Sequence, residues 1–131
     1  MSYQSINPNT GKTLKSFEHL SSAQLEHALA AADTCFKTWK HTSFAARAVV
    51  LNKAAALMHA HVDEFAKLAT LEMGKRIDEA RGEVKFSADI LAYYAKNAEA
   101  FLAPVRLHPQ HGAAHMESSP IGVLFCVEPW N

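Results

Sequence analysis

The spacing of apolar and polar positions predicts a helix over residues 22–40. Ser21 and Gln24 fit a capping box, in which the serine hydroxyl and the glutamine side chain close free backbone N–H groups at a helix start. The apolar side chains that follow recur at steps of three and four residues: Leu25, Ala28, Leu29, Ala32, Phe36 and Trp39. This spacing places them on one face, so we expect that face to be buried against another element.

A second helix is predicted from Ser43 to the region of His59. Asn52 and His59 fall on its solvent side, and the apolar residues share the opposite face: Ala46, Val49, Val50, Ala54, Leu57 and Met58. Lys53 lies within this face and is expected to extend its ammonium group to solvent. We therefore expect the apolar face to be the buried one.

Two more helices are predicted before Pro104. The third runs from about Asp63 to Met73, where Gly74 can adopt the left-handed conformation that ends a helix. A phosphate-binding turn at this glycine is disfavoured, because one glycine does not form an anion nest. The fourth helix spans residues 76–101, and its apolar side chains share one face: Ile77, Ala80, Val84, Ala88, Leu91 and Ala95.

Two β-hairpins are predicted, one at each end of the helical region. Residues 3–6 and 12–17 flank a turn that contains a proline and a glycine, which is typical of a tight reversal. Residues 105–107 and 113–118 flank a similar turn, whose proline and glycine no helix interior tolerates well.

Residues 121–127 form a nearly continuous apolar run bounded by Pro120 and Pro129. Such a run is typical of a strand buried on both faces of a parallel sheet. A single parallel strand is not stable alone, because its sheet partners and covering helices must come from elsewhere. We therefore expect the chain to be the truncated first part of an α/β protein. It divides into residues 1–104, 105–119 and 120–131.

Charge and length narrow the class of partner. The 13 lysine and arginine residues balance the 13 aspartate and glutamate residues, so no net field favours nucleic acid or an anionic membrane. The sequence has neither a bilayer-spanning apolar run nor the basic-then-apolar start of a secretory signal. Two cysteines are too few for a disulfide framework. These features predict a cytoplasmic protein with reduced thiols, whose partners are small molecules or other protein chains.

Three segments carry a resemblance to a known family. They are Ile-Asn-Pro-Asn-Thr-Gly at 6–11, Leu-Glu-Met-Gly-Lys with Glu-Ala-Arg-Gly-Glu-Val within 71–84, and Pro-Ile-Gly-Val with Glu-Pro-Trp-Asn within 120–131. In order and spacing the whole chain resembles the aldehyde dehydrogenase superfamily, and within it the bacterial succinate-semialdehyde dehydrogenases. The resemblance implies that residues 1–104 and 120–131 belong to a Rossmann-like cofactor-binding domain. It also implies that residues 105–119 form a hairpin of the kind that bridges subunits of a homo-oligomer.

The resemblance also implies a chemistry, in which an aldehyde is oxidised to a carboxylic acid with NAD or NADP through a cysteine thioester. Asn131 matches the asparagine of the family's proline-tryptophan-asparagine motif, whose side-chain amide donates to the oxyanion that develops on the substrate carbonyl. Val127, Glu128, Pro129 and Trp130 match the strand end and turn that line the cofactor site. The family's cysteine nucleophile and glutamate base lie beyond this motif, so residues 1–131 alone are expected to be inactive.

Other chemistry-bearing residues are interpreted as structural. Cys126 lies inside the apolar run, where a buried thiol stays protonated, and Cys35 is expected to be half-buried on the first helix. Glu72 with Glu79 or Glu83 is interpreted as part of a solvated helix face. No metal site is predicted, because the histidines lack cysteines or carboxylates at ligand spacing: His59, His61, His108, His111 and His115.

A function without catalysis is the alternative hypothesis. The chain would then be a helical interaction module whose last strand pairs with another chain, as exposed strand edges do. The two hypotheses differ in whether the coding sequence continues past Asn131 and supplies a cysteine nucleophile.

Overall fold

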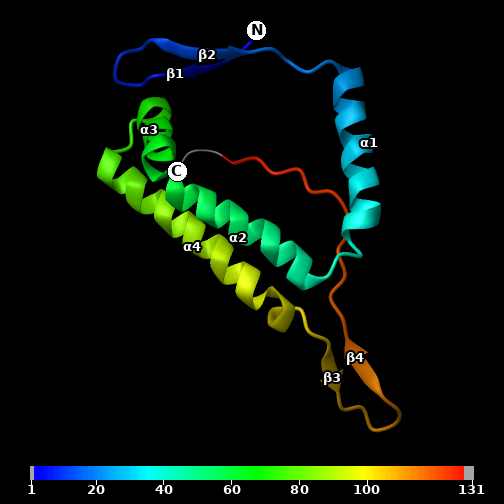
Figure 1. Ribbon diagram of the computed structural model, residues 1–131. Helices are drawn as coiled ribbons and strands as arrows, with labels where there is room; N and C mark the ends of the chain where they lie inside the picture. The colour runs from blue at the N-terminus through cyan, green and yellow to red at the C-terminus, as the bar shows by residue number, and fades with distance from the viewer. Residues whose placement is uncertain (1, 129–131) are drawn as a thin grey trace.

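The computed structural model describes residues 2–128, in which a helical body carries a β-hairpin at each end (Figure 1). Both predicted hairpins and all four predicted helices are confirmed. In chain order the elements are β1 (Tyr3–Ile6), β2 (Thr13–Phe17), α1 (Ser22–Trp39), α2 (Phe44–Ala60), α3 (Val62–Met73), α4 (Ile77–Phe101), β3 (Val105–Leu107) and β4 (Ala114–Met116).

The N-terminal hairpin is an antiparallel pair in which Tyr3 lies opposite Phe17. Its turn is closed by Asn7, whose side-chain oxygen accepts from the Asn9 N–H at 2.9 Å. The carbonyl of Asn7 accepts from the Gly11 N–H at 2.8 Å. Gly11 adopts a φ of 67°, a left-handed conformation that glycine tolerates without strain. The turn therefore forms where the sequence places its proline and glycine.

Each of the first three helices ends or begins as its sequence predicts. The capping box of α1 is present, with the Ser21 N–H donating to Gln24 Oε1 at 2.8 Å and the Gln24 N–H donating to Ser21 Oγ at 3.3 Å. At the start of α2 the Ser43 hydroxyl accepts from the Ala46 N–H at 3.1 Å. Gly74 ends α3 with a φ of 83° and donates its N–H to the Thr70 carbonyl at 3.0 Å. These bonds satisfy backbone groups that a helix end leaves free.

The core lies where α2 and α3 pack on α4, and it is made of small side chains. Among residues 2–128 the fully buried hydrophobic residues are all alanines: Ala55, Ala66, Ala69, Ala80 and Ala88. The predicted face of α4 is confirmed, because Ala80 and Ala88 are buried and Ile77 and Val84 pack at its edge. Alanine at the contact lets neighbouring helices come close, but it contributes little apolar area per residue.

The predicted buried face of α2 is wrong. Ala55 is the buried residue, whereas Val49 is 68% exposed and Leu57 is 50% exposed. His59 is exposed, as expected, and its Nε2 lies 3.1 Å from the exposed carboxylate of Asp89 on α4. The physical reason is that α2 has apolar residues on nearly every side, so their spacing alone does not select one face.

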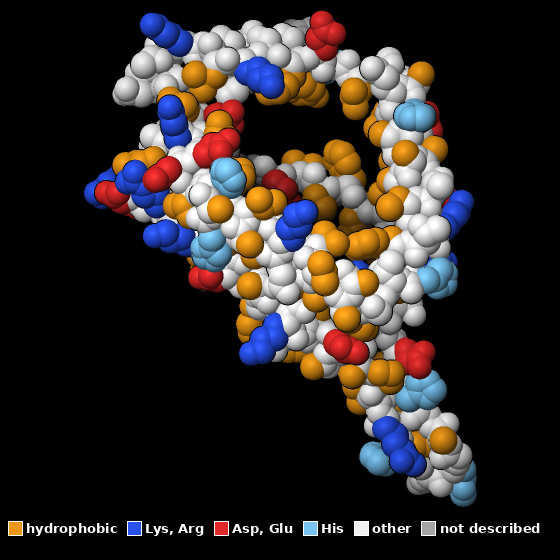
Figure 2. All heavy atoms as spheres, in the orientation of Figure 1, with side chains coloured by type: hydrophobic (Ala, Val, Ile, Leu, Met, Phe, Trp, Pro, Cys, Tyr) orange, Lys and Arg blue, Asp and Glu red, His pale blue; other side chains and the backbone are white. Residues whose placement is uncertain are grey.

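The apolar stripe of α1 is also not buried as expected. Leu25, Leu29 and Trp39 remain 47%, 46% and 43% exposed. Figure 2 shows a wide opening between the N-terminal hairpin, α1 and the segment that follows β4, with hydrophobic side chains along its rim. Ala32 and Phe36 of the stripe are half-buried, but no other helix or strand of residues 2–128 packs extensively against α1.

Arg81 ties α3 to α4 on the surface. Its Nε donates to Asp63 at 2.7 Å and its Nη1 donates to Asp78 at 3.0 Å. These two hydrogen bonds to carboxylates raise the pKa of Arg81, so the guanidinium stays charged. Between residues 2 and 128, no helix combines the length and the apolar content needed to cross a bilayer.

Candidate functional site

The site predicted from sequence lies at the carboxyl end of the chain, and the structure describes two of its five residues. Val127 is 73% exposed and Glu128 is exposed. Pro129, Trp130 and Asn131 lie outside the described residues. The predicted roles of all five, as oxyanion donor and as lining of a cofactor site, stay predictions.

Residues 121–127 do not form the expected strand in this structure. They run without strand pairing after β4 (Figure 1), and Ile121 and Phe125 are 90% and 87% exposed. A strand needs a neighbour to take up its backbone N–H and C=O groups, and residues 2–128 offer no unpaired strand beside it. The Rossmann-like placement of this segment therefore stays a prediction about a larger sheet.

Both cysteines are exposed, which corrects the expectation that Cys126 is buried and Cys35 half-buried. Burial therefore gives no reason for the Cys126 thiol to stay protonated, because no other part of residues 2–128 covers its segment. What remains against Cys126 as the nucleophile is the resemblance, which places the family's nucleophile beyond the proline-tryptophan-asparagine motif.

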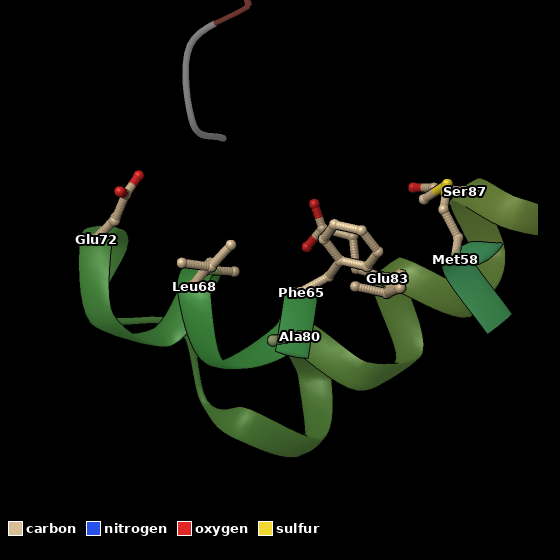
Figure 3. Close-up of a pocket in the computed structure, with 9 residues that line it drawn as sticks. Met58, Phe65, Leu68, Glu72, Ala80, Glu83 and Ser87 are labelled. Atoms are coloured by element: carbon tan, nitrogen blue, oxygen red, sulfur yellow. The ribbon is translucent and has the colours of Figure 1, made fainter. Parts of the chain in front are cut away.

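A pocket of about 260 Å³ opens between α3 and α4 (Figure 3). Phe65 and Leu68 supply apolar walls from α3, and the carboxylates of Glu72 and Glu83 reach the same pocket. The Glu83 side chain stays partly exposed, as expected for a solvated helix face, and it also forms an ion pair with the half-buried Lys75 of the α3–α4 turn. Helical spacing could not predict this pair, because its two residues are eight positions apart in the sequence. Only the turn between α3 and α4 brings their side chains together.

Three of the candidate histidines, His59, His61 and His115, each lie against a single carboxylate. His61 lies 3.2 Å from Glu64, and His115 lies 3.1 Å from Glu117. Within the described residues, no three His, Cys, Asp or Glu side chains gather into a group that can hold a metal ion. The described geometry therefore gives no support for a metal centre in this part of the chain.

Comparison with known proteins decides the family. The aldehyde dehydrogenase family model matches residues 1–131, which is the whole chain. The chain belongs to the aldehyde dehydrogenase family. A solved succinic semialdehyde dehydrogenase from Streptococcus pyogenes, in complex with NADP+, superimposes with a TM-score of 0.82 at 33% identity; the match covers 86% of this chain and 25% of that one. The predicted resemblance to the aldehyde dehydrogenase superfamily is therefore confirmed.

Curated relatives of this aldehyde dehydrogenase chain are similar over its full length. A succinate-semialdehyde dehydrogenase (NADP(+)) from Deinococcus radiodurans is 40% identical over 129 residues, which is 98% of this chain and 27% of the relative. A succinate-semialdehyde dehydrogenase (NADP(+)) 1 from Mycobacterium tuberculosis is 39% identical over 134 residues, which is 100% of this chain and 29% of the relative. The chain thus spans a little over a quarter of the length of these relatives.

Proposed function

We propose that this chain is the amino-terminal part of a succinate-semialdehyde dehydrogenase that uses NADP. The observation that carries the proposal is the full-length similarity to curated relatives of that name, at 40% identity over 98% of the chain. The fold supports it, because the neighbour bound to NADP+ has the same arrangement over 86% of the chain. The whole enzyme would oxidise succinate semialdehyde to the carboxylic acid through a cysteine thioester.

Asn131 is the residue of this chain that we assign to the chemistry. Its neutral amide would donate an N–H to the negative charge that develops on the aldehyde oxygen when the thiolate attacks. A neutral donor stabilises that charge without becoming a competing acid, and one such donor is worth about 3 to 4 kcal/mol of transition-state free energy. A bound nicotinamide cofactor would supply the hydride acceptor for the oxidation.

Val127 and Glu128 fit only part of a cofactor site. Both side chains are exposed, so both are available to a ligand. An aliphatic side chain and a carboxylate suit the lining of a nicotinamide or ribose, but neither offers the positive charge or N–H groups that phosphates need. We therefore propose that they line the cofactor, and that groups outside residues 127 and 128 hold its phosphates.

The assignment of Asn131 is tested in the polypeptide encoded by the complete gene. Asn131→Ala should lower kcat for succinate semialdehyde with NADP by about a hundredfold to a thousandfold. Asn97→Ala is the matched control, because Asn97 donates to the Tyr93 carbonyl of its own helix, at 2.7 Å. An equal loss of kcat in both variants, or no loss in Asn131→Ala, would remove Asn131 from the mechanism.

The proposal also predicts the behaviour of the isolated 131-residue chain. It should reduce no NADP with succinate semialdehyde, because the nucleophile is assigned to a position beyond the proline-tryptophan-asparagine motif.

The two exposed cysteines are tested in the whole gene product. Replacing them by Cys35→Ser and Cys126→Ser should leave its dehydrogenase activity unchanged. A loss of covalent substrate labelling in Cys126→Ser would instead make Cys126 the nucleophile.

One feature favours the second candidate function, that of an interaction module. Residues 121–127 expose a row of apolar side chains and unpaired backbone, with Ile121 at 90% and Phe125 at 87%. Such a segment can add to the sheet edge of another chain. A whole gene product that lacks dehydrogenase activity but binds a partner through this segment would favour this second function.

A further inference from the structure

A cavity of about 440 Å³ lies where the α1–α2 connection, the end of α4 and the segment after β4 meet. Lys40 comes from the end of α1, Arg47 from the first turns of α2, and Ser118 and Ser119 from the segment after β4. The end of α1, the start of α2 and this segment lie together in Figure 1, and neither residue 127 nor residue 128 lines the cavity. The cavity is therefore separate from the site proposed above.

The lining of this cavity is cationic. It contains Lys40 and Arg47 and no aspartate or glutamate. Neither cation takes part in the ion pairs found within residues 2–128. Each lies over an aromatic ring instead, the Arg47 guanidinium carbon 4.4 Å from the centre of Phe44 and the Lys40 ammonium 5.4 Å from that of Phe36. Two like charges thus line one hollow without a carboxylate to balance them.

The side chain of Arg47 has a specific unmet need. Its Nε is buried and has no hydrogen-bond partner among the described residues. Leaving a buried N–H of a charged group without an acceptor is costly, and the cost is removed when an acceptor oxygen enters. Ring stacking over Phe44 holds the guanidinium plane but supplies no such oxygen.

Hydroxyl groups complete the lining. The Thr42 hydroxyl already donates to the Trp39 carbonyl at 2.7 Å, so it has no proton left to offer a ligand. The Ser43 hydroxyl accepts from the Ala46 N–H as the cap of α2, so one of the free backbone N–H groups at the start of this helix already has a partner. Ser118 and Ser119 bring two further hydroxyl donors to the same hollow. The groups available to bind a ligand are therefore the two cationic side chains and the two serine hydroxyls, and not the backbone at the helix start.

We propose that this cavity binds a small oxyanion, with the anion held between Lys40 and Arg47. A carboxylate and a phosphate share the required chemistry, since the oxygens of either accept from the N–H groups of a guanidinium and from an ammonium. The anion would supply acceptor oxygens to the guanidinium of Arg47 and balance the two positive charges that line the cavity. The proposal does not depend on the dehydrogenase activity.

Titration of the chain with inorganic phosphate and with succinate tests the proposal. The readout is the NMR signal of the Arg47 Nε–H group at low ionic strength, where screening is weak. We expect a saturable shift of this signal, with the tighter anion identifying a phosphate or a carboxylate as the ligand group. Lys40→Met should weaken binding at least about tenfold, because one charge-assisted hydrogen bond is lost.

Two further variants keep the test decisive. Arg47→Lys keeps the charge but loses the planar donor group, and should weaken binding at least about tenfold in a folded protein. Lys53→Met is the control, because Lys53 is an exposed lysine of α2 outside the cavity, and its removal should leave the affinity unchanged. The proposal is overturned if neither anion shifts the Arg47 signal. It is equally overturned if Lys53→Met weakens binding as much as Lys40→Met.

Discussion

Two glycine-to-alanine substitutions in adjoining parts of the helical body should change stability in opposite directions. Gly74 ends α3 with a φ of 83°, a conformation that costs an L-residue about 1 to 2 kcal/mol. A Cβ added there would also lie 3.2 Å from the Cγ of Pro8 in the N-terminal hairpin. Strain and crowding act together, so Gly74→Ala should lower the free energy of unfolding by about 2 kcal/mol.

Gly82 offers the opposite case within α4. It lies inside the helix, and a Cβ added there meets nothing within 4 Å. Alanine loses less backbone entropy than glycine on entering a helix, so Gly82→Ala should raise the free energy of unfolding by about 1 kcal/mol. The two variants carry the same chemical change, so the difference between them reports only the local backbone and its surroundings.

Urea and thermal unfolding followed by helical circular dichroism measure both effects. For a chain of this size, 1 kcal/mol corresponds to a shift in Tm of about 4 °C, so the two variants should differ by roughly 12 °C. Gly112→Ala separates strain from crowding, because Gly112 has a φ of 77° but no neighbour within 4 Å of an added Cβ. If Gly74→Ala proves as stable as Gly82→Ala, the assignment of a left-handed helix end against the hairpin is refuted.

Three further substitutions test contacts described above. Ser21→Ala removes the capping box of α1 and should cost that helix about 1 kcal/mol, seen as faster amide exchange in its first turn. Lys75→Met leaves the Glu83 carboxylate without its partner and should destabilise the protein, while Lys75→Met with Glu83→Gln should recover part of the loss in a double-mutant cycle. Arg81→Met should destabilise the α3–α4 contact less in about 1 M salt than at low salt. Because folding raises the pKa of Arg81, its contribution to the free energy of unfolding is fully present below the ordinary pKa of arginine. That contribution is lost only as the pH rises through the raised pKa of the folded state. The loss of stability in Arg81→Met should therefore stay constant between about pH 6 and 9.

Local signals in the sequence predicted the elements well. Capping at Ser21, the left-handed helix end at Gly74 and the turn at Gly11 each depend on a few neighbouring residues, and each is present in the structure. The face of α4 was also predictable, because its apolar residues form one stripe between polar ones.

The packing partners were less predictable, because they depend on segments far apart in the chain. The apolar residues of α2 surround the helix, so their pattern did not reveal that Ala55 faces the core. The strand at 121–127 was inferred from composition, but a strand exists only with a partner, and the described residues provide none. The pairing of Lys75 with Glu83 depends on the turn between α3 and α4, and the cavity shared by Lys40, Arg47 and Ser118 depends on a distant segment; local patterns specify neither.

The all-alanine core has a consequence for how this polypeptide behaves during synthesis. Domains fold amino terminus first as the chain emerges at about 5 to 20 residues per second, and α2, α3 and α4 can pair early because they are neighbours in sequence. Their contact buries little apolar area, while the stripe of α1 and the segment containing Leu124 and Phe125 stay open to water. That segment combines high β-propensity with low charge, which is the signature of aggregation-prone sequence. The nascent chain should therefore be a strong client for chaperones that bind extended apolar segments, until these surfaces are covered.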